Sequence, residues 1–286
     1  MTQASVLKRQ LDTILETYQR RTFLHSDPIS IPHRYKRPVD QEMTGFLSAM
    51  MAFGSVKSML PALDKAVGWL GEDPVSRLLA ANDADVQRET MGFQYRWVRQ
   101  SDLHRVLMSL RKTYGEGRTL EGLFKLGYQA TDADTLAGMD TMLTGLRMAL
   151  PEGSLEHYGT RYLIPGPGGN GARKRVHMFL RWMVRKDAVD LGLWSTPKAK
   201  QCIIPLDTHV ARIARLLGLS DRRSMDGRMA REITDKSREF DPSDPVKYDF
   251  AISRLGILGV CPSKRDTNAC RPCELRPSCR HWNDAA

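Results

Sequence analysis

Apolar side chains recur along this chain at the spacing of a helix that buries one face. Met43, Phe46, Leu47, Met50 and Met51 occupy positions i, i+3, i+4, i+7 and i+8 of such a helix. The same periodicity predicts further helices at residues 6–18, 56–70, 74–81, 101–114, 119–127 and 133–149. Patterns that alternate as strands do are scarce, so the fold class that we expect is all-α.

Two stretches interrupt the helical pattern. Residues 26–41 contain three prolines and are expected to form an irregular connector. Residues 164–171 read Ile-Pro-Gly-Pro-Gly-Gly-Asn-Gly, which predicts a turn, because glycine reaches backbone conformations that other residues avoid. The sequence therefore predicts helices before and after a glycine-rich turn.

Composition adds one feature to this picture, which is a strong positive charge. The chain has 286 residues, of which 41% are hydrophobic and 27% charged, as in a soluble globular protein. It has neither the roughly 20-residue apolar run of a membrane helix nor an apolar signal segment. We therefore expect a cytoplasmic protein with no membrane partner. Its net charge of +10 favours a polyanionic partner such as a nucleic acid.

Four of the five cysteines are clustered near the end of the chain. Cys261, Cys270, Cys273 and Cys279 have the spacing C-x8-C-x2-C-x5-C, whereas Cys202 stands apart. Clustered thiolates in a cytoplasmic chain indicate a metal centre rather than a disulfide framework. The spacing allows either an iron–sulfur cluster or zinc, since both accept four thiolate ligands.

Two polar residues beyond the glycine-rich turn are candidates for chemistry. Residues 172–185 form an amphipathic pattern whose first turn holds Lys174. The positive end of the helix dipole and nearby cations disfavour a charged ammonium there. A neutral lysine amine is the nucleophile of Schiff-base chemistry, so Lys174 is a candidate nucleophile. Asp207 precedes the next amphipathic helix and is expected to cap its N-terminus.

The end of the chain resembles a known family. The apolar segment 248–261, followed by Cys-Arg-Pro-Cys and Cys279, is similar to the C-terminus of endonuclease III and of adenine DNA glycosylases. These belong to the helix-hairpin-helix DNA glycosylase superfamily. The resemblance implies a [4Fe–4S] cluster on Cys261, Cys270, Cys273 and Cys279, which in the family is structural and helps to dock DNA. The first cysteine spacing is two residues longer in this chain than in the family.

The region around Lys174 and Asp207 resembles the catalytic segment of the same superfamily. The family has a glycine-rich hairpin, then a lysine at the start of a helix, then an apolar-Asp-Thr-His stretch. By this resemblance Lys174 attacks the sugar C1′, and Asp207 stabilises the charge that develops on the sugar. The implied function is a DNA-repair glycosylase with AP-lyase activity in base excision repair. We expect a monomer acting on double-stranded DNA that contains a damaged base.

A further fragment bears on the lesion. Gly92–Arg96 is similar to the Gly-apolar-Gly-Tyr-Arg segment of oxoguanine glycosylases, with glutamine in place of the second glycine. This resemblance favours an oxidised purine as the excised base. Phe93, Tyr95 and Trp194 are the aromatic side chains that we expect to stack on the extruded base.

The resemblance also implies an architecture. The expected structure is a two-lobed helix-hairpin-helix glycosylase fold with a C-terminal iron–sulfur cluster loop at 261–279. A six-helix barrel-like lobe would cover 42–160, and 1–41 with 161–286 would form the second lobe. The expected DNA contacts are glycines of the turn and basic side chains near the lysine and the cysteines: Gly166, Gly168, Gly169, Gly171, Arg173, Arg181, Lys264, Arg265 and Arg271.

The glycine-rich turn departs from the family pattern. The family hairpin is usually a short Leu-Pro-Gly-Val-Gly two residues before the lysine, whereas Lys174 stands eight residues after Gly166. Two alternatives therefore stay open. One is a non-catalytic DNA-binding protein of the same fold. The other is a zinc-containing nucleic-acid-binding protein in which Lys174 contacts a phosphate.

Overall fold

The computed structural model describes residues 3–283, and the chain divides into two units. Unit 1 comprises Met1–Phe23, Asn170–Arg181 and Lys198–Ala286, and unit 2 comprises Leu24–Gly169 and Trp182–Pro197. Unit 2 contains the whole of the predicted 42–160 lobe and extends beyond it at both ends. Each unit is therefore assembled from segments that lie far apart in the sequence.

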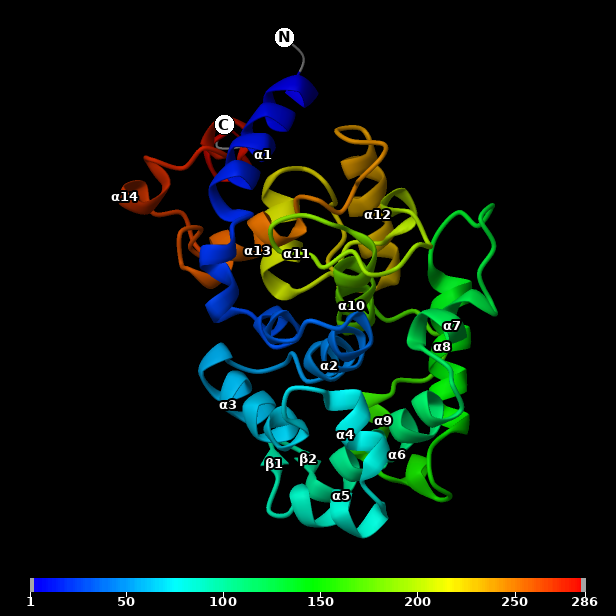
Figure 1. Ribbon diagram of the computed structural model, residues 1–286. Helices are drawn as coiled ribbons and strands as arrows, with labels where there is room; N and C mark the ends of the chain where they lie inside the picture. Colours follow the sequence, from blue (N-terminus) through cyan, green and yellow to red (C-terminus); the bar gives the residue numbers. More distant parts are fainter. Residues whose placement is uncertain (1–2, 284–286) are drawn as a thin grey trace. The chain divides into compact units, whose positions relative to one another are not determined.

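Helices dominate the described part of the chain, which confirms the all-α class (Figure 1). Apart from isolated bridges, the strands within residues 3–283 form a single two-stranded sheet. In it β1 (Gln94–Tyr95) pairs antiparallel with β2 (Val98–Arg99). None of the described helices is long and apolar enough to cross a lipid bilayer.

Unit 2 is built around α6 (Gln100–Gly115). Leu103, Val106, Leu107 and Leu110 are fully buried and recur along one face of this helix at helical spacing. Four helices pack against α6, namely α4 (Pro74–Ala80), α5 (Asp83–Glu89), α8 (Leu136–Met148) and α9 (Tyr158–Leu163). Unit 2 also contains α2 (Pro38–Met50), α3 (Val56–Val67), η4 (Gly68–Leu70), α7 (Leu120–Lys125) and η5 (Ser154–Glu156).

The prediction that residues 26–41 form an irregular connector is wrong in detail. After η1 (Arg21–Ser26), the prolines open short 3-10 helices, η2 (Pro28–Ser30) and η3 (Pro32–Arg34), and Pro38 is the first residue of α2. Proline suits the first position of a helix, because its φ is already helical and its missing N–H would have no partner there. The prolines therefore begin helices in this segment rather than exclude them.

A buried carboxylate in unit 2 joins three segments. Glu42 on α2 accepts hydrogen bonds from the Tyr114 hydroxyl (2.7 Å) and from the backbone N–H groups of Leu120 (2.9 Å) and Glu121 (3.0 Å). It also accepts one from the Trp194 indole N–H (2.7 Å). Burial raises the pKa of Glu42, and these four hydrogen bonds oppose that rise. Because all four partners donate, only the ionised carboxylate can accept from all of them.

Unit 1 packs α11 (Thr208–Leu216) beside α13 (Asp249–Ile257), and α1 (Gln3–Tyr18) against α13 (Figure 1). The helix α10 (Lys174–Val184) begins in unit 1 and ends in unit 2. The remaining helices of unit 1 are η6 (Ala199–Gln201), α12 (Gly227–Arg238), α14 (Thr267–Cys270), η7 (Arg276–Ser278) and α15 (Arg280–Asn283).

Polar contacts at the start of α13 hold unit 1 together. The Tyr248 hydroxyl donates to Asp12 of α1 (2.7 Å), and the Lys247 ammonium donates to Asp241 (2.8 Å). Ser243 donates to Asp241 through both its backbone N–H and its hydroxyl. Partial burial opposes ionisation of Asp241, but these hydrogen bonds outweigh it and lower its pKa from 3.8 to about 2.

This lowered pKa predicts an acid-sensitive contribution to stability. The folded pKa lies below the unfolded one, so Asp241 stabilises the fold above about pH 4, and the effect is lost as the pH falls towards 2. We expect Asp241→Asn to lower the free energy of unfolding at pH 7 by about 1–2 kcal/mol, allowing for screening. Thermal melts across this pH range should show the difference from wild type shrinking with acid. Asp235→Asn is the control, because the Asp235 side chain is 65% exposed; a difference that persists unchanged at low pH would contradict the assignment.

Candidate functional site

Lys174 and Asp207 lie together in unit 1, each at the start of a helix. Lys174 is the first residue of α10, as predicted, and its Nζ is 3.8 Å from Oδ2 of Asp207. The other carboxylate oxygen of Asp207 accepts a hydrogen bond from the backbone N–H of Val210 (2.8 Å) and caps α11, which confirms the predicted cap. The cap thus fixes the carboxylate and leaves Oδ2 for the lysine. The side chains of Lys174 and Asp207 are 31% and 16% exposed, so solvent reaches the pair.

The pair brings the amine of Lys174 within reach of a carboxylate. An amine attacks a carbon atom only after it has lost its extra proton, so a nucleophilic role for Lys174 requires a nearby group that takes up that proton. Asp207 is the nearest described carboxylate able to accept that proton, or to stabilise a positive charge formed beside the amine.

A close helix contact sets the position of α11. A Cβ added to Gly256 on α13 would lie 2.3 Å from Nδ1 and 2.6 Å from Cβ of His209 on α11. Because the Cβ of His209 is fixed to its backbone, a rotamer change alone cannot relieve this clash. Glycine at position 256 therefore lets α11, which Asp207 caps, approach α13 closely.

We expect Gly256→Ala to lower the free energy of unfolding by about 1–3 kcal/mol, because α11 must move away from α13. Urea denaturation monitored by circular dichroism would measure this. Gly68→Ala is the matched control, since its added Cβ meets nothing within 4 Å and its φ of −60° suits alanine. If Gly256→Ala were as stable as wild type, the two helices could move apart without any loss in the free energy of unfolding.

The polar face predicted for the helix after the turn is largely buried. Arg181 is 2% exposed and forms an ion pair with Asp249, with its guanidinium 5.8 Å from the ring centre of Phe250. This placement gives Arg181 a structural partner and does not favour its predicted contact with DNA. His177, one turn after Lys174, is also buried, and burial lowers its pKa to about 3, so it is neutral.

The glycine-rich turn is exposed in both units. Gly166, Gly168 and Gly169 belong to unit 2, and the latter two have φ of 69° and 87°, which only glycine adopts readily. Gly171 belongs to unit 1 and forms a bridge with Asp226, next to the hydrogen bond from Gly227 N–H to Asn170 O (2.8 Å). Their exposure leaves the predicted phosphate contacts of these glycines as a prediction. Arg173, also predicted to bind DNA, precedes α10 with φ of 45°.

The four clustered cysteines line one pocket of unit 1. Cys261, Cys270, Cys273 and Cys279 share this pocket with apolar side chains, which are Ile213, Leu216, Leu217, Val260, Leu275 and Trp282. No three His, Cys, Asp or Glu side chains within residues 3–283 are arranged as ligands of one metal ion in this conformation. The four thiols thus line the same pocket, and the metal centre predicted for them stays a prediction.

The chemistry of this pocket fits a cationic group. Burial, together with the charge of neighbouring thiolates, raises the pKa of Cys273 and Cys279, and backbone N–H groups donate to both sulfurs. The Arg212 guanidinium donates to Cys261 Sγ (3.2 Å) and to the carbonyls of Cys261 and Pro262 (2.7 Å each). Four soft sulfur donors in an apolar pocket suit iron or zinc, whose charge would offset the repulsion between thiolates.

The basic residues of the cysteine loop are exposed. Lys264, Arg265 and Arg271 all face solvent, as a phosphate contact requires. Arg265 and Arg276 place their guanidinium carbons 3.8 and 4.4 Å from the ring centre of Trp282. Stacking on the indole limits the motion of both guanidinium groups.

The three aromatic residues expected to stack on a base are buried in unit 2. Phe93, Tyr95 and Trp194 are 3%, 5% and 6% exposed. The Tyr95 hydroxyl donates to the carbonyl of Phe53, and the Trp194 indole donates to Glu42. In this conformation their contacts are structural, so the prediction of a base pocket gains no support.

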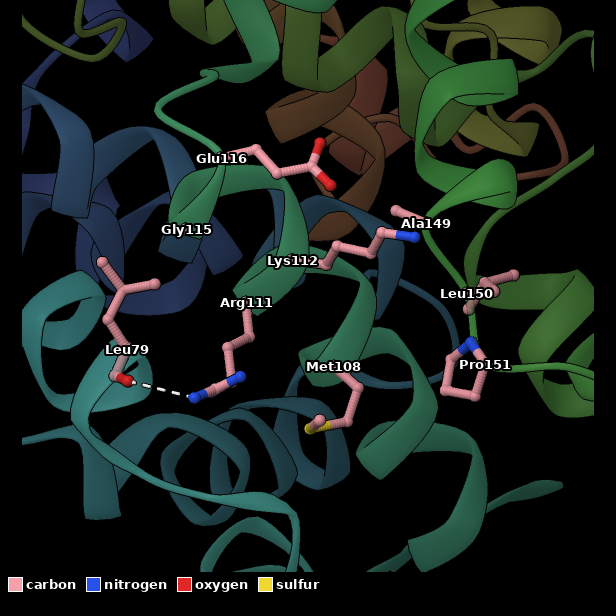
Figure 2. Close-up of a pocket in the computed structure, with 9 residues that line it drawn as sticks. All are labelled: Leu79, Met108, Arg111, Lys112, Gly115, Glu116, Ala149, Leu150 and Pro151. Atoms are coloured by element: carbon pink, nitrogen blue, oxygen red, sulfur yellow. Dashed lines mark hydrogen bonds between the residues drawn. The ribbon is translucent and has the colours of Figure 1, made fainter.

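A surface cavity of about 720 Å³ lies along α6 in unit 2 (Figure 2). Its charged side chains are Arg111, Lys112 and Glu116. Arg111 donates to the carbonyls of Ala81 (2.7 Å) and Leu79 (3.3 Å), so it ties α6 to the end of α4. None of the predicted site residues lines this cavity. Its described groups contain no nucleophile paired with a base, so Lys174 and Asp207 are the stronger candidates for catalysis.

Sequence reasoning missed several residues that shape these sites. Arg212 and Trp282 contact the cysteine loop, and Gly256 sets the position of α11. Arg212 lies on α11, the helix that Asp207 caps. Its position five residues after Asp207 was therefore a signal that the sequence offered. The close approach at Gly256 depends on two helices far apart in the sequence, and periodicity cannot reveal it.

Comparison with known proteins gives a family match over most of the chain. The model of a family described as "Protein of unknown function (DUF2400)" matches residues 27–258, a range that includes Lys174 and Asp207 and ends before Cys261. No curated protein and no solved structure gives a significant match.

Proposed function

We propose that this chain, which belongs to the DUF2400 family, is a DNA-repair glycosylase with AP-lyase activity on double-stranded DNA containing a damaged base. The observation that carries the proposal is the Lys174–Asp207 pair, an amine 3.8 Å from a carboxylate at the starts of two helices. Schiff-base chemistry requires at least an accessible amine and a neighbouring group that accepts its proton. The net charge of +10 supports a nucleic-acid substrate.

The chain's own groups would act as follows. Lys174, after passing one proton to Asp207, attacks C1′ of the damaged nucleotide, and the bond from C1′ to the base breaks. The base leaves with that electron pair and takes up a proton. The sugar ring then opens to an iminium ion as one of the two protons left on the amine nitrogen moves to the ring oxygen, while the other proton stays on the nitrogen. Loss of a proton from C2′ expels the 3′ phosphate by β-elimination and nicks the strand, and water then releases Lys174.

We further propose that the cysteine loop holds a structural [4Fe–4S] cluster. Cys261, Cys270, Cys273 and Cys279 would be its ligands, and Arg212 would fix the loop against α11. The cluster would supply rigidity rather than catalysis. It would hold the exposed cations Lys264, Arg265 and Arg271 in place for DNA phosphates.

The activity is tested by borohydride trapping on a panel of duplexes, each carrying one lesion. An oxidised purine, an oxidised pyrimidine, an alkylated base, a mismatch and an abasic site would be compared. Because borohydride reduces an imine to a stable amine, a covalent protein–DNA band is expected with at least one duplex, together with strand nicking. Tight duplex binding with neither an adduct nor base release would contradict the proposal and favour a non-catalytic DNA-binding protein.

The cofactor is tested independently of activity. Anaerobically purified protein should be yellow-brown, with broad visible absorption and about four iron atoms per chain. Replacing Cys270 by serine should bleach this absorption, whereas Cys202→Ser, outside the loop, should not. A colourless protein that contains one zinc atom per chain would contradict the iron–sulfur assignment while leaving the lyase test unaffected.

A further inference from the structure

An aromatic cluster on unit 2 takes no part in the proposed chemistry. Phe53 stacks on Trp97, with 5.0 Å between ring centres and 14° between ring planes. Tyr162 meets both rings edge-on, at 4.9 and 5.0 Å. Tyr158 lies 6.0 Å from Tyr162 and 6.4 Å from Trp97. Tyr158 is 58% exposed, so it lies at the solvent-facing end of the cluster.

Two arginines border this aromatic cluster. The guanidinium carbon of Arg96 lies 5.1 Å from the ring centre of Trp97. Arg161 follows Tyr158 by three residues on α9 and donates to the carbonyl of Leu155 (2.6 Å). Both side chains are exposed, and neither has an ion-pair partner within the described residues. The cluster therefore combines a solvent-exposed aromatic ring with two positive charges that have no ion-pair partner in the described part of the chain.

The helix that carries Tyr158 is fixed in place at its start. Tyr158 is the first residue of α9, and α9 is tied to the buried carboxylate of Asp102. The Thr160 hydroxyl and the Arg99 backbone N–H each donate to that carboxylate, at 2.9 Å. A Cβ on Gly159 would lie 2.2 Å from the same carboxylate, so the close contact requires glycine. A preorganised ring loses little conformational entropy on binding, which favours recognition.

We propose that the aromatic cluster is a stacking site for unpaired nucleobases of single-stranded nucleic acid. Tyr158 supplies the stacking face, and Arg96 and Arg161 attract the flanking phosphates. Every base has a face that can stack on an aromatic ring, and the negative backbone matches the two uncompensated cations. Proline-rich peptides also bind aromatic surfaces, but they need no such cations. The site stands whether or not Lys174 performs chemistry.

The test measures binding of fluorescein-labelled oligothymidylate of about 15 nucleotides by anisotropy at low, fixed salt. We expect Tyr158→Ala to weaken binding by about tenfold, through loss of base stacking. Tyr158→Phe should bind as wild type, because stacking needs the ring and not the hydroxyl. Tyr158→Leu, which keeps an apolar side chain but removes the ring, should be as weak as Tyr158→Ala.

Matched controls separate this site from the general charge of the protein and from other tyrosines. Tyr128→Ala removes another tyrosine of unit 2, packed 5.2 Å from Phe124, and should leave affinity unchanged. Lys112→Gln removes an exposed positive charge of unit 2 outside the aromatic cluster and should bind the oligonucleotide as wild type. Unchanged binding by Tyr158→Ala, or equal losses in Tyr158→Ala and Tyr128→Ala, would overturn the proposal. So would failure to bind oligothymidylate by a wild-type protein that binds a proline-rich peptide through Tyr158.

Discussion

A Lys174→Gln variant should form no borohydride-trapped adduct on the duplex that traps wild-type protein. An amide nitrogen cannot form an imine, so the covalent intermediate has no attacking group. Single-turnover strand nicking is expected to fall by about a thousandfold or more, as when an enzyme loses its nucleophile. The Lys174–Asp207 pair is partly exposed and contributes only about 0–1 kcal/mol, so the melting temperature should hardly change.

Two further variants sharpen this result. Lys236→Gln removes another lysine of unit 1 that pairs with a carboxylate, Glu239 at 3.0 Å, and should trap as wild type. Asp207→Asn keeps an oxygen that can cap α11 but loses the negative charge, so nicking should slow by about a hundredfold while the fold persists. Trapping of Lys174→Gln at wild-type yield would show that another amine is the nucleophile, and would end the proposed role of Lys174.

The starts of α10 and α11 could be predicted because their signals are local. A glycine-rich turn before an amphipathic stretch predicted that Lys174 would lie in the first turn of a helix. An aspartate before the next amphipathic stretch predicted the cap at Asp207. The distance between Lys174 and Asp207 is not a local property. Only the resemblance to glycosylases anticipated that the two residues would meet.

The polar face of α10 shows where periodicity fails. A charged residue on a helix is expected to face solvent, but Arg181 is buried because Asp249, far away in sequence, neutralises it. Phe93 and Trp194 show the opposite case, in which side chains predicted to bind a ligand are buried in the core. The sequence around an aromatic side chain looks the same whether that side chain packs in a core or stacks on a ligand. Only tertiary contacts distinguish the two roles.

The cysteine loop was partly predictable. The four cysteines are clustered in the sequence, and in the fold all four line one pocket. Spacing alone cannot decide between iron and zinc, because both metals accept four thiolates. That choice depends on the metal that the purified protein contains.

Replacing Glu42 by glutamine should destabilise unit 2 far more than so small a change suggests. One carboxylate oxygen accepts from Glu121 N–H and Trp194 N–H, and the other accepts from Tyr114 O–H and Leu120 N–H. A glutamine must turn its NH₂ group towards one of these pairs. Each pair contains a backbone N–H that cannot accept a hydrogen bond, so donors face each other in a buried site. We expect a loss of about 3–5 kcal/mol in the free energy of unfolding.

Glu121→Gln is the matched control, because Glu121 contributes only its backbone N–H to the network and the substitution leaves that N–H in place. Oε1 of Glu121 accepts from the backbone N–H and hydroxyl of Ser195, at 2.8 and 3.0 Å, and a glutamine oxygen can replace it. That variant should lose about 1 kcal/mol or less, chiefly through its ion pair with Lys125 (2.9 Å). Urea denaturation of both variants, read from tryptophan fluorescence, measures the contrast. Equal losses would mean that Glu42 contributes through side-chain volume alone, whereas a large difference would follow from the direction of its four hydrogen bonds.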